Sequence, residues 1–456
     1  DSRPTITNAA KYFPSSGKKG DKTTGLFDKV AKVLFPNQVG EKALEGKNLE
    51  QRRKAWCWAK MELRSIITRL RSFSGVAETF QCSGKYTELF QEGTFVQRGA
   101  KWTLNNSYAI LNELKSQELT EEQEETGNRY PESPDRVECR QKYLKHLVEK
   151  GISGKTLMIH ELVEKVLSVR RSMSKGIRAQ INAQYDSLVE DIVKEFSELC
   201  ELRKSQNLPP PNLGSWVLMS DVSGSMSGIP MLVSIGMGIL GSDPRIASAE
   251  FANLVQTFDT DPVFHSLVEC KDFVDKVHSL STAPWGGCTN FHRAMDLIKK
   301  VVVDNSWPPE QVKALKLIVV SDMQFNIACS SNWDTAYDCI KKSFAKNGYE
   351  PPTIIFINAR ESTGYPCDSD EPGTILLSGW SPSIFKFLLT GEMEKEEEVI
   401  DESGEAIQVK RKVTPEEALQ QILDNSVFDP VRQVIDRHME GITEILHSLK
   451  VAKDTP

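Results

Sequence analysis

The second half of the chain alternates short apolar runs with helical patterns, and this alternation limits the fold more than any other feature. Six runs have the length and composition of buried strands: Trp216–Ser220, Leu254–Phe258, Val263–Val268, Leu315–Val320, Thr353–Asn358 and Thr374–Leu377. Helical patterns fall between and after them, near residues 230–240, 271–280, 290–303, 334–346 and 382–390. Strands that alternate with helices favour a largely parallel sheet covered on both faces. We therefore predict an α/β domain over residues 213–456.

The first half has helical periodicity instead. Apolar residues recur every three or four positions, as they do along one face of an α-helix. One such stripe is Leu26, Val30 and Leu34, ending at Pro36, and a second is Trp56, Ala59, Leu63, Ile66 and Leu70. Further helical patterns cover Lys142–Glu149 and Leu157–Arg203. The stiff segment Asn207–Asn212, which holds three prolines, then separates the halves. We predict an all-α domain over residues 1–212.

Two stretches interrupt these patterns with acidic residues. Glu118–Pro134 is acidic and rich in turn-forming residues, which predicts a solvated loop. Gly391–Lys412 contains five glutamates within seven residues, and we interpret it as an exposed or disordered insertion in the α/β domain.

The composition is ordinary for a globular protein, with 39% apolar and 26% charged residues in 456 positions. No apolar run is long enough to cross a bilayer, so no membrane partner is expected. The nine cysteines are odd in number and scattered, which favours reduced thiols over a disulfide framework. The expected location is therefore the cytoplasm, or a virion if the protein is viral.

Charge is unevenly distributed between the halves. Residues 1–212 hold 35 Lys+Arg and 28 Asp+Glu, a net of +7. The remaining 56 − 35 = 21 basic and 63 − 28 = 35 acidic residues give residues 213–456 a net of −14. Such an asymmetry suggests different partners for the two halves.

Four basic residues lie on one side of the second helical stripe: Arg53, Lys60, Arg64 and Arg71. The ordinary interpretation is a solvated helix flank. The functional alternative is contact with the phosphates of RNA, whose affinity would fall steeply with salt.

A motif that suits a hard metal ion follows the first strand of the α/β half. Asp221, Ser223 and Ser225 form an Asp-x-Ser-x-Ser sequence directly after the apolar run that begins at Trp216. Thr289 opens a later helical pattern, and Asp322 follows another strand. Ligands of α/β sheets gather at the carboxyl ends of strands. Carboxylate and hydroxyl oxygens suit Mg²⁺ or Mn²⁺, so the sequence predicts such a site there.

These motifs resemble the von Willebrand factor A domain family, which has a Rossmann-like fold. They are Asp221-Val-Ser-Gly-Ser225, Gly287-Cys-Thr289-Asn and Val320-Ser-Asp322. The resemblance implies a metal-ion-dependent adhesion site in which Ser223, Ser225 and Thr289 supply hydroxyls. Asp221 and Asp322 would hold the ion mostly through waters, and an acidic side chain of a partner would complete the coordination. Cys288 departs from the usual Gly-Gly-Thr run of the family.

A longer stretch resembles a narrower family. Residues 216–262, Ser321–Phe325, Ile355–Asn358 and Ser378–Ser381 resemble plant, fungal, protist and viral proteins classified as domain of unknown function 2828. That family is related to the TROVE/Ro proteins. The resemblance implies a ring of helical repeats that binds small or misfolded RNA, closed by an A domain.

Residues near the predicted metal form an expected rim for a partner: Trp285, Met323, Gln324 and Phe325. Aromatic and methionine side chains beside a charged anchor are typical of a binding hot spot. Enzyme motifs do not match, because Ser223 replaces the second carboxylate of Asp-x-Asp phosphotransferases and no Gly-Lys-Ser/Thr run exists.

We therefore predict a non-enzymatic scaffold that binds Mg²⁺ or Mn²⁺ and, through the ion, an exposed Asp or Glu of a protein partner. Two alternatives remain. One is a Ro-like RNA-binding ribonucleoprotein component whose A domain is structural. The other is a structural component of a large assembly, including a viral one.

Overall fold

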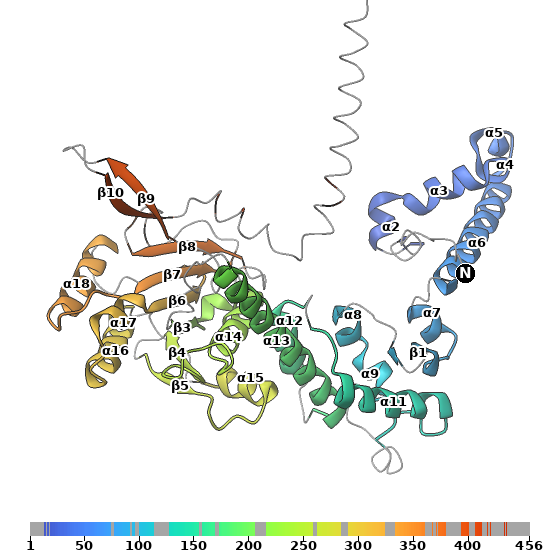
Figure 1. Cartoon of the computed structure of the whole chain (residues 1–456). Helices are drawn as coiled ribbons and strands as arrows, with labels where there is room; N and C mark the ends of the chain where they lie inside the picture. The colour runs from blue at the N-terminus through green and yellow to red at the C-terminus, as the bar shows by residue number, and fades with distance from the viewer. Residues whose placement is uncertain are drawn as a thin grey trace, which may run out of the picture. The chain divides into compact units, whose positions relative to one another are not determined.

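The computed structural model divides the chain into two compact units, Asp1–Lys150 and Gly151–Pro456 (Figure 1). It describes residues 13–14, 16–17, 19–73, 77–91, 94–95, 100–113, 127–154, 157–168, 173–205, 216–258, 262–283, 291–323, 333–360, 367, 371, 373–379, 394–400, 406–412, 417, 420, 433 and 435. Within these residues, no helix is both long enough and apolar enough to traverse a bilayer.

The first unit is built mainly from helices. They are α2 (Lys19–Thr24), α3 (Leu26–Leu34), α4 (Pro36–Val39), α5 (Glu41–Leu44), α6 (Leu49–Phe73), α7 (Ala77–Cys82), the 3₁₀ turn η1 (Thr87–Leu89), α8 (Ala100–Asn105), α9 (Ser107–Ile110) and α11 (Pro134–Lys150). The all-α prediction misses one short antiparallel pair, β1 (Phe90–Gln91) with β2 (Thr94–Phe95).

Helix α6 buries a different stripe from the one that the sequence suggested. Ala59 and Leu63 are buried as expected, but the third buried position is Ile67, whereas Ile66 and Leu70 are exposed. The core that forms there includes Phe27 and Ala31 of α3.

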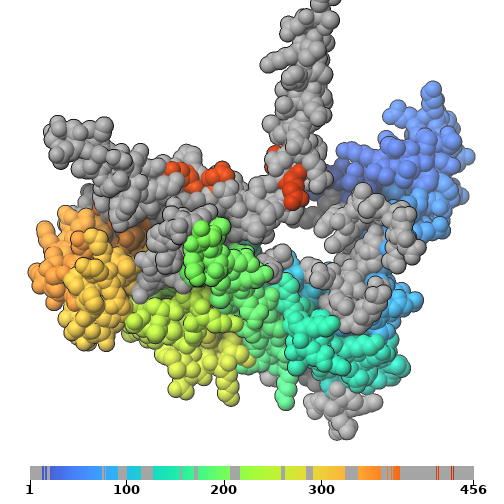
Figure 2. Space-filling model, viewed as in Figure 1, coloured from blue at the N-terminus to red at the C-terminus, as the bar shows by residue number. Residues whose placement is uncertain are grey.

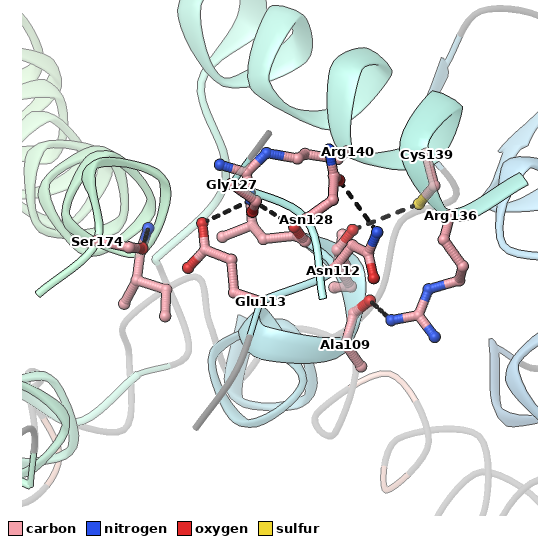
Figure 3. Close-up of polar contacts among 12 residues, drawn as sticks. Ala109, Asn112, Glu113, Gly127, Asn128, Arg136, Cys139, Arg140 and Ser174 are labelled. Atoms are coloured by element: carbon pink, nitrogen blue, oxygen red, sulfur yellow. Dashed lines mark hydrogen bonds and ion pairs between the residues drawn. The ribbon is translucent and has the colours of Figure 1, made fainter. Parts of the chain in front are cut away.

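Helix α11 supplies the donors that satisfy the end of α9 (Figure 3). The Arg140 Nη1 atom donates to the carbonyl of Leu111 at 2.8 Å and to that of Gly127 at 2.7 Å, and it lies 2.9 Å from Glu113 Oε1. Arg136 donates to the carbonyl of Ala109 at 2.8 Å. The last carbonyls of a helix have no partner within the helix, so these arginines take that role. Residues 118–126 of the predicted acidic loop lie outside the described residues.

The second unit contains a six-stranded sheet and most of the remaining helices. Its elements are α12 (Ile159–Leu167), α13 (Lys175–Ser205), β3 (Trp216–Asp221), the 3₁₀ turn η2 (Gly224–Met226), α14 (Ile229–Gly241), β4 (Leu254–Phe258), β5 (Phe264–Ser266), α15 (Phe273–Ser281), α16 (Phe291–Asp304), α17 (Pro309–Ala314), β6 (Lys316–Ser321), α18 (Trp333–Ala345), β7 (Thr353–Asn358), β8 (Thr374–Ser378), β9 (Glu394–Ile400) and β10 (Ala406–Lys412). The sheet order is β5-β4-β3-β6-β7-β8, and only the β4–β5 pairing is antiparallel.

This arrangement confirms the mostly parallel α/β sheet. Each of the six predicted strands is present, with ends within two residues of the predicted ones. Four of the five predicted helices are also present, as α14, α15, α16 and α18, while residues 382–390 lie outside the described residues. Helix α17 was not predicted.

Alternate residues of the central strands face two layers of helices. Val217 and Met219 of β3 join a core cluster with Ala294 and Ile298 of α16 and with Ile340 of α18. On the opposite face, α14 approaches β3 through glycines (Figure 1). A Cβ atom at Gly238 would lie 2.5 Å from Ser220 Oγ, and one at Gly241 would lie 2.6 Å from a methyl of Leu218. The small residues of α14 therefore permit this close approach.

The boundary between the units differs from the predicted one at residues 212/213. Helices α12 and α13, assigned to the helical half from sequence, belong to the second unit. Gly236 of α14 lies against Ile159 of α12, so that a Cβ there would be 2.7 Å from Ile159 Cγ1. In the space-filling view, the green atoms of α13 lie against the yellow-green part of this unit (Figure 2). Helical periodicity identifies helices but not the core into which they pack. The proline-rich segment Asn207–Asn212 was therefore wrong as the boundary between the units.

The acidic insertion contains regular structure. Strands β9 and β10 pair antiparallel, and the register places Glu396 opposite Lys410 and Glu394 opposite Lys412. Opposite charges in register favour such a pairing. The sequence interpretation counted the glutamates alone and overlooked the basic partners that follow them, so disorder was the wrong expectation for residues 394–400 and 406–412.

Candidate metal centre

Three neighbouring strands bring polar residues to one edge of the sheet. Asp221 is the last residue of β3, Asp322 directly follows β6, and Arg360 comes two residues after β7. Strands β3, β6 and β7 are parallel neighbours, with Ser220 paired to Val320. Their carboxyl ends therefore lie at the same edge, where ligands of α/β sheets bind. The predicted convergence of Asp221 and Asp322 at this edge is present.

Ser223 and Ser321 donate hydrogen bonds to the Asp221 carboxylate, which is almost entirely removed from solvent. Only 1% of Asp221 is exposed. The Ser223 backbone N–H donates to Oδ1 at 2.9 Å, and the Ser321 hydroxyl donates to Oδ2 at 2.5 Å. The Ser321 hydroxyl oxygen also accepts from the Met323 N–H at 3.1 Å. An aspartate that accepts from the backbone two residues later favours a tight turn, and this turn leads into η2.

That turn places two serine hydroxyls side by side. Ser223 Oγ and Ser225 Oγ are 2.9 Å apart. Gly228, with φ of 94°, then turns the chain into α14, a backbone conformation that a side chain would strain. Two neighbouring ligands of octahedral Mg²⁺, each about 2.1 Å from the ion, lie about 3 Å apart. The spacing of the two hydroxyls therefore fits one edge of such an octahedron.

The electrostatic environment of Asp221 is unfavourable to its charge. Burial raises the pKa of the Asp221 carboxyl above its ordinary value, and the neighbouring Asp322 raises it further. Hydrogen bonds from Ser321 and Ser223 lower the pKa without cancelling the effect of burial. A buried carboxylate in this condition gains from a nearby positive charge.

Arg360 supplies one positive charge to this edge, and the sequence reasoning missed it. Its backbone N–H donates to Asn358 Oδ1 at 2.9 Å. Its Nη1 donates to the Ser225 carbonyl at 2.8 Å and lies 3.5 Å from Asp322 Oδ2. The Arg360 side chain is 42% exposed, whereas that of Asp322 is fully buried. Its position just after a buried parallel strand was the signal that could have identified it.

The donor chemistry at this edge fits a hard divalent ion. It offers two carboxylates and two hydroxyls, all oxygen ligands, which suit Mg²⁺ or Mn²⁺. No group of three or more His, Cys, Asp or Glu residues is arranged to hold a metal anywhere in the described part of the chain. The guanidinium beside Asp322 is the one feature that an ordinary cation site would not require.

The other predicted site residues have different outcomes. Thr289, Trp285, Gln324 and Phe325 lie outside the described residues. Met323 is wrong as a rim residue, because it is only 9% exposed and belongs to the core cluster beneath the sheet edge. The backbone of Met323 has a positive φ of 63° directly after β6.

An exposed apolar residue that was not predicted follows the serine loop in the chain. Ile229, the first residue of α14, is 48% exposed and follows the loop that carries the two serines. The neighbouring Ser227 and Gly228 are exposed as well. Among the described residues, these three extend the accessible surface from the candidate site along the start of α14.

The basic side of α6 is only partly available to a ligand. Lys60 pairs with Asp28 at 2.8 Å and lies over the Trp56 ring. Arg71 donates to the Phe13 carbonyl at 2.6 Å. Arg53 and Arg64 are exposed. Two of the four predicted phosphate contacts are thus used within the unit, which weakens the prediction of a continuous basic stripe.

One match to a known family lies within the second unit. A family model described as a domain of unknown function, DUF7788, matches residues 215–423. The resemblance of the sequence motifs to the domain of unknown function 2828 stays a prediction. The match begins at the first strand of the sheet and extends past the β9–β10 hairpin.

Two relatives cover more of the chain. The chain is 26% identical over 338 residues to the uncharacterized protein L728 of Acanthamoeba polyphaga mimivirus, which is 73% of this chain and 52% of that protein. It thus spans about half the length of this relative. The crystal structure of the Ro (RSR) protein of Deinococcus radiodurans covers 80% of this chain and 74% of its own, at 13% identity. Its TM-score of 0.37 is too low to equate the two folds.

Proposed function

We propose that the second unit binds Mg²⁺ or Mn²⁺ through Ser223, Ser225, Asp221 and Asp322, and presents the ion to an acidic side chain of a protein partner. The observation that carries this proposal is the pair of serine hydroxyls 2.9 Å apart beside two buried carboxylates. Thr289 would add a third hydroxyl, as the resemblance to A domains implies.

Charge favours a binding role over a catalytic one. Two carboxylates leave little or no excess negative charge on a divalent ion. The loaded site would therefore attract an external carboxylate. Metal-dependent hydrolases use the ion to activate water or to clamp a phosphoryl group, commonly with more protein ligands than these. We accordingly propose a scaffold protein and no enzymatic turnover.

Calorimetric titration of the full chain with MnCl₂ tests the metal site. We expect saturable binding by the wild type and loss of that heat in the double variant Ser223→Ala/Ser225→Ala. Ser227→Ala is the matched control, because Ser227 is exposed in the same loop, and it should bind as the wild type does. The proposal fails if the wild type shows no heat at millimolar Mn²⁺ or Mg²⁺, or if the double variant binds equally well.

The rival functions predict different sensitivities of the bound partner. An acidic protein partner held through the ion should dissociate in EDTA and resist RNase, and it should not bind Ser223→Ala/Ser225→Ala. A Ro-like RNA-binding role predicts the reverse, together with a steep loss of affinity as salt rises. The exposed Arg53 and Arg64 are the residues that this second function would use.

A further inference from the structure

The guanidinium of Arg360 and the proposed metal share one carboxylate. Arg360 Nη1 lies 3.5 Å from Asp322 Oδ2, and the Asp322 side chain is fully buried. A divalent ion that uses Asp322, directly or through water, would add positive charge beside this guanidinium. Like charges brought together at a poorly solvated edge repel each other strongly. Arg360 and the ion are therefore competitors for Asp322.

The same nitrogen atom also holds the loop that carries the serine hydroxyls. Arg360 Nη1 donates to the Ser225 carbonyl at 2.8 Å, and this bond joins the end of β7 to η2. Ser225 is one of the two residues whose hydroxyls face each other. Any displacement of the Arg360 guanidinium thus removes a contact with Asp322 and a tether on the metal-binding turn in one step.

Arg360 is positioned so that it can move between two environments. Its backbone is fixed by the bond from its N–H to Asn358 Oδ1, which anchors the start of the side chain. Its side chain is 42% exposed, so this long and flexible arginine can turn toward solvent once its contacts with Asp322 and Ser225 are broken. Asp322, by contrast, is buried and has no comparable freedom.

Resting on the metal site proposed above, we propose that Arg360 is an internal counter-ion that opposes metal binding. It pairs with Asp322 in the metal-free protein and withdraws from both Asp322 and the Ser225 carbonyl when a divalent ion binds. The affinity of the site is consequently lower than its oxygen ligands alone would give, and loading of the ion releases the η2 turn. Arg360 is in this sense a positioning residue and not a metal ligand.

Titration of the full chain with MnCl₂ tests the competition. Arg360→Met removes the charge but keeps an apolar side chain of similar reach, and we expect it to bind Mn²⁺ at least tenfold more tightly than the wild type. Arg360→Lys keeps the charge and should stay within about threefold of the wild type. Equal or weaker binding by Arg360→Met, with normal binding by the wild type, overturns the inference while leaving the metal site intact. Binding by Arg360→Met alone would show that the guanidinium blocks the site, which supports the inference but overturns metal binding by the wild type. Binding by neither protein overturns both proposals.

A second measurement on the unmodified protein reports the withdrawal itself. Phenylglyoxal reacts with accessible guanidinium groups, and peptide mass spectrometry gives the extent of modification at each arginine. We expect Mn²⁺ to increase modification of Arg360 and to leave that of Arg53, exposed on α6, unchanged. Unchanged or reduced modification of Arg360 in Mn²⁺ overturns the proposed withdrawal, and it does so without relying on any variant.

Discussion

Two buried aspartates in the second unit have opposite electrostatic surroundings. Asp243, 2% exposed, accepts from Arg245 Nε and Nη2, both at 2.9 Å, and from the Tyr185 hydroxyl at 2.9 Å. Asp221, 1% exposed, accepts hydrogen bonds from the Ser321 hydroxyl and from Ser223. Burial raises the pKa of each carboxyl. At Asp243 the bonds and charge of Arg245 outweigh that effect and lower the pKa, whereas at Asp221 the pKa remains raised.

The difference separates an architectural ion pair from a site that is suited to a ligand. Asp243 lies just after α14 and, through Tyr185, ties α13 to the segment that follows α14. Arg245 neutralises its charge within the fold. Arg140 and Glu113 of the first unit form a similar closed pair (Figure 3). Asp221 lies at the sheet edge where an external ion can approach. A buried carboxylate whose charge is poorly matched inside the protein marks a functional candidate.

The largest effect is expected when the arginine of the Arg245–Asp243 pair is replaced. Arg245→Met leaves Asp243 buried without its bidentate partner, and we expect a loss of about 2 to 3 kcal/mol in the free energy of unfolding. A fully buried pair loses about 3 to 5 kcal/mol in this way, and the partial exposure of Arg245 reduces the effect. Urea unfolding followed by circular dichroism measures it. Arg245→Lys, which keeps the charge but not the fork, should lie between the variant and the wild type. A loss below about 0.5 kcal/mol would contradict the role given to Arg245.

Replacing each aspartate by asparagine should change the free energy of unfolding by a smaller amount, and in opposite directions for Asp221 and Asp243. In EDTA at pH 7, Asp221→Asn removes a poorly compensated buried charge and should raise the free energy of unfolding by about 1 kcal/mol. Asp243→Asn removes a well-compensated charge and should lower the free energy of unfolding, because Arg245 then loses its bidentate partner and keeps the ion pair with Asp186. Unfolding of the two variants side by side supplies the control. Destabilisation of both by similar amounts would mean that the two carboxylates do not differ as described.

The sheet was predictable from sequence because its strands have a distinctive composition. A run such as Thr353–Asn358 is short, rich in β-branched and aromatic residues and buried on both faces, and few alternatives fit that pattern. Helix α17 was missed because its six residues are too few to show a helical period. The place of α13 was missed for another reason: its contacts with Asp243 and Asp272 span 58 and 90 or more residues, and no local pattern encodes them.

The site was predictable only in part for the same physical reason. Asp221, Ser223 and Ser225 form a local motif, and Asp322 follows a recognisable strand. Arg360 has no motif around it. Its importance arises because β7 pairs with β6, which brings its Nη1 to Ser225, 135 residues earlier in the chain. Register and pairing order decide such contacts, and neither can be derived from composition.

The smallest expected effect is in the pH dependence of the Arg245→Met variant. Asp243 has a lowered pKa in the folded wild type, so its contribution to stability is present above the ordinary value of 3.8 and is lost as the pH falls through the folded pKa. In Arg245→Met that carboxyl is buried without its cation, so burial raises its pKa and protonation relieves the variant instead. The stability difference between wild type and variant should therefore narrow, by roughly 1 kcal/mol or less, as the pH falls from 7 toward 4.

Urea unfolding at pH 7, 5 and 4 measures this difference in the free energy of unfolding. Because Asp221 is unchanged in both proteins, its own titration cancels, and a difference that stays constant with pH would show that Arg245 stabilises the fold through packing and not through the charge of Asp243.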